Sequence, residues 1–277
     1  MLPISARRVI DAALQEDLGL GDVTSSALVA SHRQLRAAAV AREALVACGV
    51  EVAAEVFWRV DRDLEVAMAA NDGERVAPGG TLLRVEGAAR ALLGAERVVL
   101  NLLQHLSGVA TTTRAYVDAV AEYPTRVCDT RKTTPGLREL EKMAVRCGGG
   151  HNHRAALGDC VMVKDNHIAV CGSVSAAVAA ARKHAPHTAT IEVEADNPSQ
   201  ATEAADAGAS IVLLDNMTPA AVGEAVTQLG GRVTVEVSGG VTIETAADYA
   251  RAGADVISIG ALTHSRRWVD IGLDYVG

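Results

Sequence analysis

Aromatic residues are scarce in this sequence. Phe, Trp and Tyr make up 3% of the 277 residues, and only one of them is Phe. Proteins that hold single-stranded nucleic acid stack the bases on aromatic rings, and this chain has few rings to offer. The formal net charge of −8 also argues against a broad basic surface for phosphates. We therefore expect no nucleic-acid partner, although the composition still allows a local basic pocket.

Paired cysteines and long apolar runs are also lacking. The number of cysteines is odd and none lie in a C-x-x-C motif, so the sequence suggests neither a paired disulfide framework nor a zinc knuckle and fits reduced thiols in a cytosol. No segment approaches the ~18 consecutive apolar residues of a membrane span. The N-terminus mixes acids and bases where a signal peptide would be apolar. We expect a soluble cytoplasmic protein without a membrane partner; its cysteines are Cys48, Cys128, Cys147, Cys160 and Cys171.

Apolar residues are abundant, at 49% of the chain with a mean hydropathy of +0.17, so a buried core is expected. Their spacing predicts a first helix over residues 4–14 and a first α+β region over residues 35–87. A long helical segment follows over residues 88–120. After Pro124, short apolar strands alternate with helices, which is typical of parallel βαβ units. The expected strands are residues 126–128, 161–163, 190–193, 210–214, 233–237 and 256–259.

Polar or glycine residues follow each of these strands at once, which is where an α/β barrel builds its active site. The later units repeat about every 22 residues, from Asp215 to Ser238 to Gly260. A complete barrel needs ~250 residues and only about 150 are available, so we expect an incomplete barrel. An open Rossmann-like sheet is the alternative, but no G-x-G-x-x-G motif follows the first strand of this region.

Positive charge gathers in Val127–Ile168, which holds seven Lys and Arg and three His against five acids. Arg131 and Lys132 follow one predicted strand, and Arg154 and Lys164 flank the next. A Lys or Arg is usually a solvated surface charge, but these positions at strand ends favour a site. Arg suits the geometry of carboxylates and phosphates, and Lys supplies a mobile charge. The substrate is therefore expected to carry several negative charges.

Two further groups complete this predicted site. His151 and His153 have the H-x-H spacing of zinc ligands, although neighbouring cations would repel a metal, so contact of His153 with substrate is favoured. Glu194 and Asp215 each end a strand and are expected to hold sugar hydroxyls or Mg²⁺; a structural ion pair is the alternative. The small residues after the last two strands suit a phosphate site, since they expose backbone N–H groups. These are Ser238, Gly239 and Gly240, and Ile259, Gly260 and Ala261.

The motifs that carry these residues run through nearly the whole chain in order. They include "EDLGLGDVTS", "DTRKTTPGLRELEKMAVRCGGGHNHRAALGD", "VMVKDNHI", "EVEADN", "VEVSGGV" and "GADVISIGALTHS". In this combination the sequence resembles the quinolinate phosphoribosyltransferase family, also called nicotinate-nucleotide pyrophosphorylase (carboxylating).

The resemblance implies an α/β fold with an α+β N-terminal domain and an incomplete, seven-stranded α/β barrel. The implied domains are residues 1–108 and 109–265, with a C-terminal tail, residues 266–277, that packs back on the first. The implied reaction joins quinolinate to phosphoribosyl pyrophosphate and releases pyrophosphate and CO₂, giving nicotinate mononucleotide for NAD synthesis. A homodimer, or a larger assembly of dimers, is implied as well.

The resemblance also implies roles for single residues. The quinolinate pocket is expected to contain Thr130, Arg131, His153, Arg154 and Lys164, with Arg97 entering from a second subunit. Lys132 is expected to contact pyrophosphate, and Glu194 and Asp215 to hold the ribose hydroxyls and Mg²⁺. The loops 238–240 and 259–261 are expected to bind the 5′-phosphate. Lys132, Lys164, Glu194 and Asp215 are the expected catalytic residues.

Two other functions compete with this interpretation. Lys164 at a strand end would suit an aldolase that forms a Schiff base. A related phosphoribosyltransferase-like protein with another substrate, or a binding module without activity, would keep the same fold. The intact "DTRKTTPG" and "HNHR" motifs argue against loss of activity.

Overall fold

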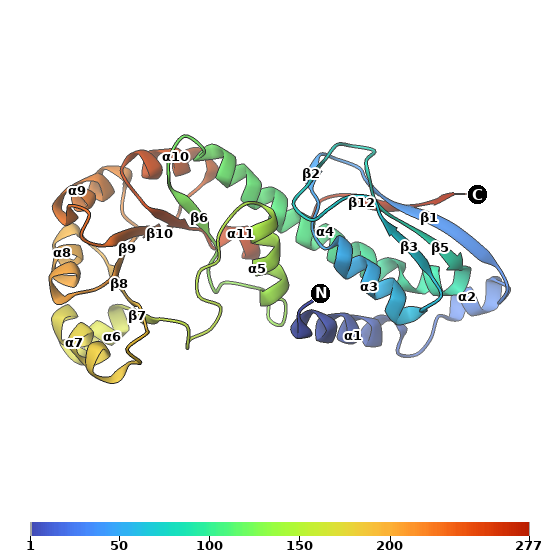
Figure 1. The fold of residues 1–277 in the computed structure, drawn as a ribbon, viewed down its shortest axis with the longest axis horizontal. Helices are drawn as coiled ribbons and strands as arrows, with labels where there is room; N and C mark the ends of the chain where they lie inside the picture. Colours follow the sequence, from blue (N-terminus) through green and yellow to red (C-terminus); the bar gives the residue numbers. More distant parts are fainter. Residues whose placement is uncertain (1, 277) are drawn as a thin grey trace. The chain divides into compact units, whose positions relative to one another are not determined.

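The computed structural model describes residues 2–276, and they form two compact units (Figure 1). The first contains the chain up to Arg114, the segment Thr133–Gly149 and the chain from Ala261 onward. The second contains Ala115–Lys132 and Gly150–Gly260. The chain therefore passes between the two units more often than the predicted domain boundaries imply, because residues 133–149 belong with the first unit.

The first unit is built on an antiparallel sheet with strand order β12-β1-β5-β3. Helix α3 packs on β3 and β5, and α1 packs on α3. The single Phe of the chain, Phe57, is fully buried on α3 together with Val52 and Val56, so this core is mostly aliphatic. The elements of this unit and the long helix that leaves it are α1 (Ile4–Leu18), α2 (Val23–Leu28), β1 (Gln34–Ala41), β2 (Leu45–Val46), α3 (Val50–Val60), β3 (Glu65–Met68), β4 (Arg75–Val76), β5 (Thr81–Ala88), α4 (Ala89–Ala119), α5 (Arg138–Cys147), α11 (Ala261–His264) and β12 (Ile271–Val276).

The second unit is a parallel sheet with strand order β6-β11-β10-β9-β8-β7, and helices line the outside of its curve (Figure 1). The register aligns Ser238 of β10 with Asp215 of β9 and with Ser258 of β11, so the carboxyl ends of neighbouring strands meet at one edge. The strands are β6 (Arg126–Cys128), β7 (Val161–Val163), β8 (Ile191–Ala195), β9 (Ile211–Asp215), β10 (Thr234–Ser238) and β11 (Val256–Ser258). The helices are α6 (Asp165–Cys171), α7 (Val174–His184), α8 (Pro198–Ala207), α9 (Pro219–Leu229) and α10 (Ile243–Arg251).

The sheet stays open, as the sequence predicts for an incomplete barrel. Over residues 2–276 it contains six strands, the six expected from the sequence pattern, where the resemblance implied seven. Beyond β6 a single bridge joins Cys128 to His151, directly after Gly148–Gly150. A run of three glycines lacks the side chains that stabilise a strand, so pairing is limited here to one residue.

Short loops with strong caps keep the strand ends in register. Helices α8 and α9 each begin with Pro after a side-chain cap, Asn197 and Thr218 respectively. Both end at a glycine in the left-handed region, Gly208 and Gly230. Within the described chain, no helix combines the length and the apolar character needed to cross a membrane.

Candidate active site

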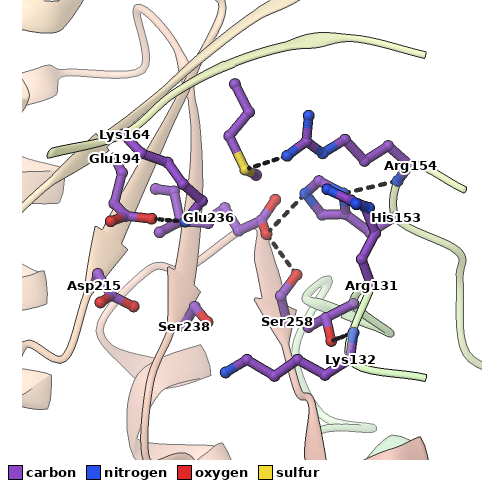
Figure 2. Close-up of a pocket in the computed structure, with 13 residues that line it drawn as sticks. Arg131, Lys132, His153, Arg154, Lys164, Glu194, Asp215, Glu236, Ser238 and Ser258 are labelled. Atoms are coloured by element: carbon purple, nitrogen blue, oxygen red, sulfur yellow. Dashed lines mark hydrogen bonds and ion pairs between the residues drawn. The ribbon is translucent and has the colours of Figure 1, made fainter. Parts of the chain in front are cut away.

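A cavity opens at the carboxyl ends of the parallel strands, within the second unit (Figure 2). Each strand supplies at least one residue from its end or from the loop that follows it. Polar and charged side chains predominate, and four of them are Lys or Arg. The lining residues are Thr130, Arg131, Lys132, His153, Arg154, Met162, Lys164, Glu194, Leu213, Asp215, Glu236, Ser238 and Ser258.

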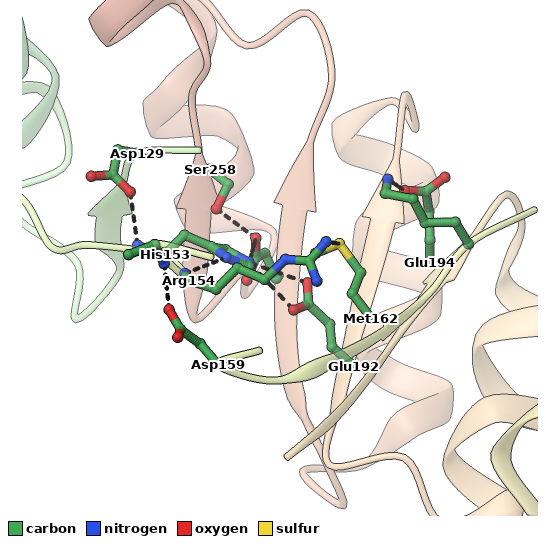
Figure 3. A network of polar contacts seen from close by, with 11 residues as sticks. Asp129, His153, Arg154, Asp159, Met162, Glu192, Glu194 and Ser258 are labelled. Atoms are coloured by element: carbon green, nitrogen blue, oxygen red, sulfur yellow. Dashed lines mark hydrogen bonds and ion pairs between the residues drawn. The ribbon is translucent and has the colours of Figure 1, made fainter. Parts of the chain in front are cut away.

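The segment before Arg154 is fixed by a buried carboxylate (Figure 3). Asp129, which directly follows β6 and is fully buried, accepts a hydrogen bond from the His153 backbone N–H at 2.8 Å. It also accepts one from the Asn152 side-chain amide at 2.6 Å. On the other side, Asp159 accepts hydrogen bonds from the backbone N–H groups of Ala155 and Ala156. These anchors hold His153 and Arg154 over the cavity although neither lies on a strand.

His153 sits against two buried glutamates (Figures 2 and 3). Its Nε2 lies 3.3 Å from carboxylate oxygens of both Glu192 and Glu236, which are 1% and 3% exposed. Ser258 donates a hydrogen bond to Glu236. The other ring nitrogen, Nδ1, accepts the backbone N–H of Arg154 at 2.7 Å. Both ring nitrogens therefore have partners, and the orientation of the ring is fixed.

The charge of this cluster depends on opposing effects. Burial alone would lower the pKa of His153, but the hydrogen bonds to Glu192 and Glu236 outweigh it and raise the pKa to about 10. Burial, with the nearby charge of Glu236, raises the pKa of Glu192. The Arg154 hydrogen bond favours the neutral ring instead, because only an unprotonated Nδ1 can accept it. The two charge-assisted contacts to the buried carboxylates are stronger than one bond from a neutral N–H, so the net pKa of His153 is raised.

The remaining cations lie around the same cavity. Arg154 directs its guanidinium to the sulfur of Met162 at 3.2 Å. Lys164 forms an ion pair with Glu194. The Lys132 backbone N–H donates to Thr130 Oγ1 at 3.0 Å, which shapes the turn after β6. The cationic side chains thus reach the cavity from the ends of two strands and from the segment between them.

The acids at the other side of the cavity, Glu194 and Asp215, are close enough to influence each other. Burial, followed by the charge of Glu194, raises the pKa of Asp215, and the charges of Lys164 and Lys132 partly offset this. Two neighbouring carboxylate groups at the edge of a cavity are oxygen ligands of the kind that Mg²⁺ uses. The donor set therefore fits a magnesium ion that keeps most of its ligands as water or substrate oxygens.

The loop after β10 needs glycine for two reasons. Gly239 and Gly240 have φ of 91° and 63°, in the left-handed region. A Cβ on Gly239 would lie 2.2 Å from Asn216 Oδ1 and 2.8 Å from Asn216 N. Asn216 itself has φ of 54° and donates its backbone N–H to the Ser238 carbonyl. The loops after β9 and β10 are therefore packed in direct contact.

The structure gathers most, but not all, of the residues predicted from the sequence. Nine line the cavity: Thr130, Arg131, Lys132, His153, Arg154, Lys164, Glu194, Asp215 and Ser238. Six others are absent from the lining described: Arg97, Gly239, Gly240, Ile259, Gly260 and Ala261. Arg97 is an exposed residue of α4 in the first unit. The binding roles predicted for all of these residues stay predictions.

Several site residues were missed by the sequence analysis. Met162, Leu213, Glu236 and Ser258 line the cavity, and Glu192 supports His153. A signal for the glutamates was present, because each interrupts an apolar strand, "TIEV" and "VTVEV". A buried charge inside a strand needs a partner and so points to a site. The H-x-H alternative gains no support, since His151 is exposed and the potential ligand set around His153 consists of Glu192 and Glu236.

Comparison with known proteins gives consistent results over the full chain. The sequence matches the families described as quinolinate phosphoribosyl transferase, N-terminal domain, over residues 22–107, and C-terminal domain, over residues 109–274. The nicotinate-nucleotide pyrophosphorylase (carboxylating) of Mycobacterium leprae is 46% identical, over 98% of this chain and 97% of that protein. The quinolinate phosphoribosyltransferase (decarboxylating) 1b of Nicotiana tabacum is 39% identical, over 96% of this chain and 81% of that protein. The crystal structure of NadC from Streptococcus pyogenes matches with a TM-score of 0.95 and 41% identity, covering 100% of this chain and 99% of the other.

Proposed function

Because the chain belongs to the quinolinate phosphoribosyltransferase family, we propose that it transfers phosphoribosyl from phosphoribosyl pyrophosphate to quinolinate. The reaction includes decarboxylation and gives nicotinate mononucleotide, pyrophosphate and CO₂. It is a step of NAD biosynthesis. The relatives' names describe the same reaction in its two directions, as carboxylating and decarboxylating.

The observation that carries this proposal is the cationic cavity at the strand ends. Quinolinate is a pyridine dicarboxylate, and Arg131, Arg154 and Lys164 line one cavity together with His153. Arg and Lys offset the repulsion between two carboxylates and a pyrophosphate that must meet at one carbon. In this proposal Lys164 exchanges its ion pair with Glu194 for a substrate carboxylate. Thr130 contributes at the rim.

The chemistry needs charge stabilisation more than a nucleophile. As pyrophosphate leaves, the ribose carbon gains positive character, and the pyridine nitrogen attacks from the opposite face. Lys132 neutralises the departing pyrophosphate, and the arginines hold the ring nitrogen in line. Once the nitrogen is bonded to ribose, the electron-poor ring releases the adjacent carboxylate as CO₂, and the electron pair left on that ring carbon takes up a proton from water. His153, whose imidazole is held by Glu192 and Glu236, keeps the pyridine ring of quinolinate oriented during both steps.

Glu194 and Asp215 are assigned to the ribose hydroxyls and to Mg²⁺. Their neighbouring carboxylates suit a hard cation. Burial, followed by the charge of Glu194, raises the pKa of Asp215, and a bound cation would oppose both effects. When bound with pyrophosphate, magnesium would supply charge neutralisation of the leaving group. The protein's own part is to hold the ribose hydroxyls beside it.

The 5′-phosphate is assigned to the loops 238–240 and 259–261. Support comes from the consecutive left-handed glycines, Gly239 and Gly240, shortly before the start of α10. Backbone in this conformation next to a helix N-terminus can present N–H groups to an anion. Ile259 follows β11 and donates its N–H to the Cys128 carbonyl, and Gly260 and Ala261 come directly after it at the start of α11.

The proposal also covers the assembly of subunits and the location of the protein in the cell. Arg97 is assigned to the quinolinate pocket of a second subunit, so the protein acts as a homodimer or an assembly of dimers. Its exposure on α4 leaves the guanidinium accessible to such a partner. The cytoplasm is the proposed location, since the free thiols of the protein suit a reducing compartment.

An assay of nicotinate mononucleotide formation tests the function. The protein is incubated with phosphoribosyl pyrophosphate, Mg²⁺ and either quinolinate or nicotinic acid. We expect product from quinolinate and a kcat/KM for nicotinic acid lower by at least about a hundredfold, because a monocarboxylate leaves one cation of the cavity without its carboxylate partner. Comparable kcat/KM values would reject the proposal in favour of a salvage enzyme. Borohydride trapping of a Lys164 adduct with a carbonyl substrate would instead identify an aldolase.

A further inference from the structure

Two of the five cysteines lie together in the first unit, away from the site just described. Cys48 directly precedes Gly49, the N-cap of α3, and Cys147 is the last residue of α5. Their side chains are hydrogen-bonded to each other. Their Sγ atoms lie within 4.8 Å of each other. Segments far apart in the sequence thus present two thiols face to face.

The two thiols differ in access. Cys48 is fully buried, and its backbone N–H and carbonyl both bond Ser107 Oγ, at 3.0 and 3.1 Å. Cys147 is only half-buried. A small dissolved oxidant therefore reaches Cys147 first and finds Cys48 behind it.

The acidity of the pair follows the same order. The hydrogen bond from Cys48 lowers the pKa of the Cys147 thiol. The same contact, together with burial, raises the pKa of Cys48. Thiolates react with oxidants and thiols do not, so Cys147 is the more reactive of the two.

A metal site is the competing interpretation of this cluster. Asp72 places a carboxylate oxygen within 4.8 Å of both sulfurs, so three potential ligands are present. However, Asp72 Oδ1 accepts the Val50 N–H at 3.0 Å, in the first turn of α3, and so has a structural role. Structural zinc sites use four protein ligands, whereas in this cluster only the two thiol groups have no structural role of this kind. The geometry favours chemistry between the thiols.

We propose that Cys48 and Cys147 form a reversible intramolecular disulfide when the protein meets a hydroperoxide. The Cys147 thiolate attacks the peroxide O–O bond, giving a sulfenic acid and releasing hydroxide or alkoxide, which takes up a proton. The Cys48 sulfur then attacks the sulfenic sulfur, the S–S bond forms, and water leaves with the Cys48 proton. In sum, two thiols are oxidised and one hydrogen peroxide is reduced to two waters.

Glycines follow both cysteines of the pair. Gly49 follows Cys48 in the left-handed region, with φ of 87°, and Gly148–Gly150 follow Cys147. The sulfurs must approach to ~2.05 Å, with suitable Cβ geometry. A Cβ at Gly49 would lie 2.8 Å from Leu106 Cδ1 and one at Gly148 would lie 2.5 Å from the Ala110 carbonyl oxygen, so the backbone is closely packed here. The sulfurs must therefore approach mainly by rotation of the two Cys side chains.

The test uses the full-length protein and needs no substrate, so its outcome is independent of the proposed function. Fully reduced protein is treated with hydrogen peroxide, its free thiols are alkylated, and tryptic peptides are mapped by mass spectrometry. We expect a peptide pair linked through Cys48 and Cys147, which dithiothreitol separates. Protein carrying this link retains three of its five thiols.

Variants provide the controls. Cys160→Ser removes the other half-buried cysteine and should leave the cross-link unchanged, whereas Cys48→Ser should stop Cys147 at sulfenic or higher oxidation states. Circular dichroism verifies that each variant is folded, and the wild-type result needs no variant. The proposal fails if Cys147 is oxidised in the wild-type protein without bonding to Cys48, or if both stay reduced. It also fails if the isolated protein holds about one zinc per chain that is lost in both Cys48→Ser and Asp72→Asn.

Discussion

At the scale of single residues, the lysines of the cavity have different partners and the same expected importance. Lys164 pairs with Glu194, while Lys132 lies at the turn after β6. Replacing either by Ala should lower kcat/KM by at least about a hundredfold, because one preorganised charged contact to a developing charge supplies several kcal/mol of transition-state stabilisation. Steady-state kinetics with quinolinate measures this. Lys183→Ala, on an exposed turn of α7, is the matched control and should change little; retained activity in both cavity variants would refute the assignment.

His153 gives a prediction about pH. Glu192 and Glu236 raise its pKa to about 10, so the ring carries its charge below that pH and loses it above. If the charged ring contacts a substrate carboxylate, kcat/KM falls as pH rises through this pKa. Glu236→Gln removes one raising charge, and the fall should move at least about one pH unit lower. A pH profile of kcat/KM compares it with Glu224→Gln, an exposed control on α9. An unchanged alkaline limb would show that the charge of His153 has no part in binding.

At the scale of elements, the loop after β10 depends on contact with the loop after β9. Gly239→Ala would place a Cβ 2.2 Å from Asn216 Oδ1 at a φ of 91°. The loop must shift, so we expect the KM for phosphoribosyl pyrophosphate to rise about tenfold or more, which corresponds to ~1.4 kcal/mol, with a smaller effect on the KM for quinolinate.

The control for this variant is Gly158→Ala. Nothing lies within 4 Å of a Cβ at Gly158, and its φ is outside the left-handed range. Equal changes in both Michaelis constants, or none in Gly239→Ala, would contradict a phosphate role for this loop.

The sequence predicted the parallel strands well because their apolar runs are short and bounded by polar residues. It also predicted that Lys132, Lys164 and Asp215 meet, since the carboxyl ends of parallel strands share one edge. It could not predict how the segment before Arg154 is held, because that depends on the buried Asp129, which lies some twenty residues earlier. The close approach of Cys48 and Cys147 is likewise a tertiary contact without a local signal.

At the scale of the whole molecule, the site is expected to be shared between two chains. Arg97→Ala and Lys132→Ala should each be nearly inactive. In a heterodimer of the two, one site collects both defects and the other is intact, so purified heterodimers should show about half the wild-type activity. Differently tagged subunits allow their isolation after exchange. Heterodimers as inactive as their parents would show that Arg97 does not act across the interface.

The pairing of β12 with β1 has a consequence during synthesis. Ala41 has Ile271 as its partner, so one side of β1 is without its neighbour until the ribosome has made the intervening chain. At ~5–20 residues per second, the wait is about ten to fifty seconds. An uncovered strand edge is a template for pairing with other chains. The nascent protein is therefore exposed to aggregation through this edge until β12 has been made, and slower elongation should lower its soluble yield.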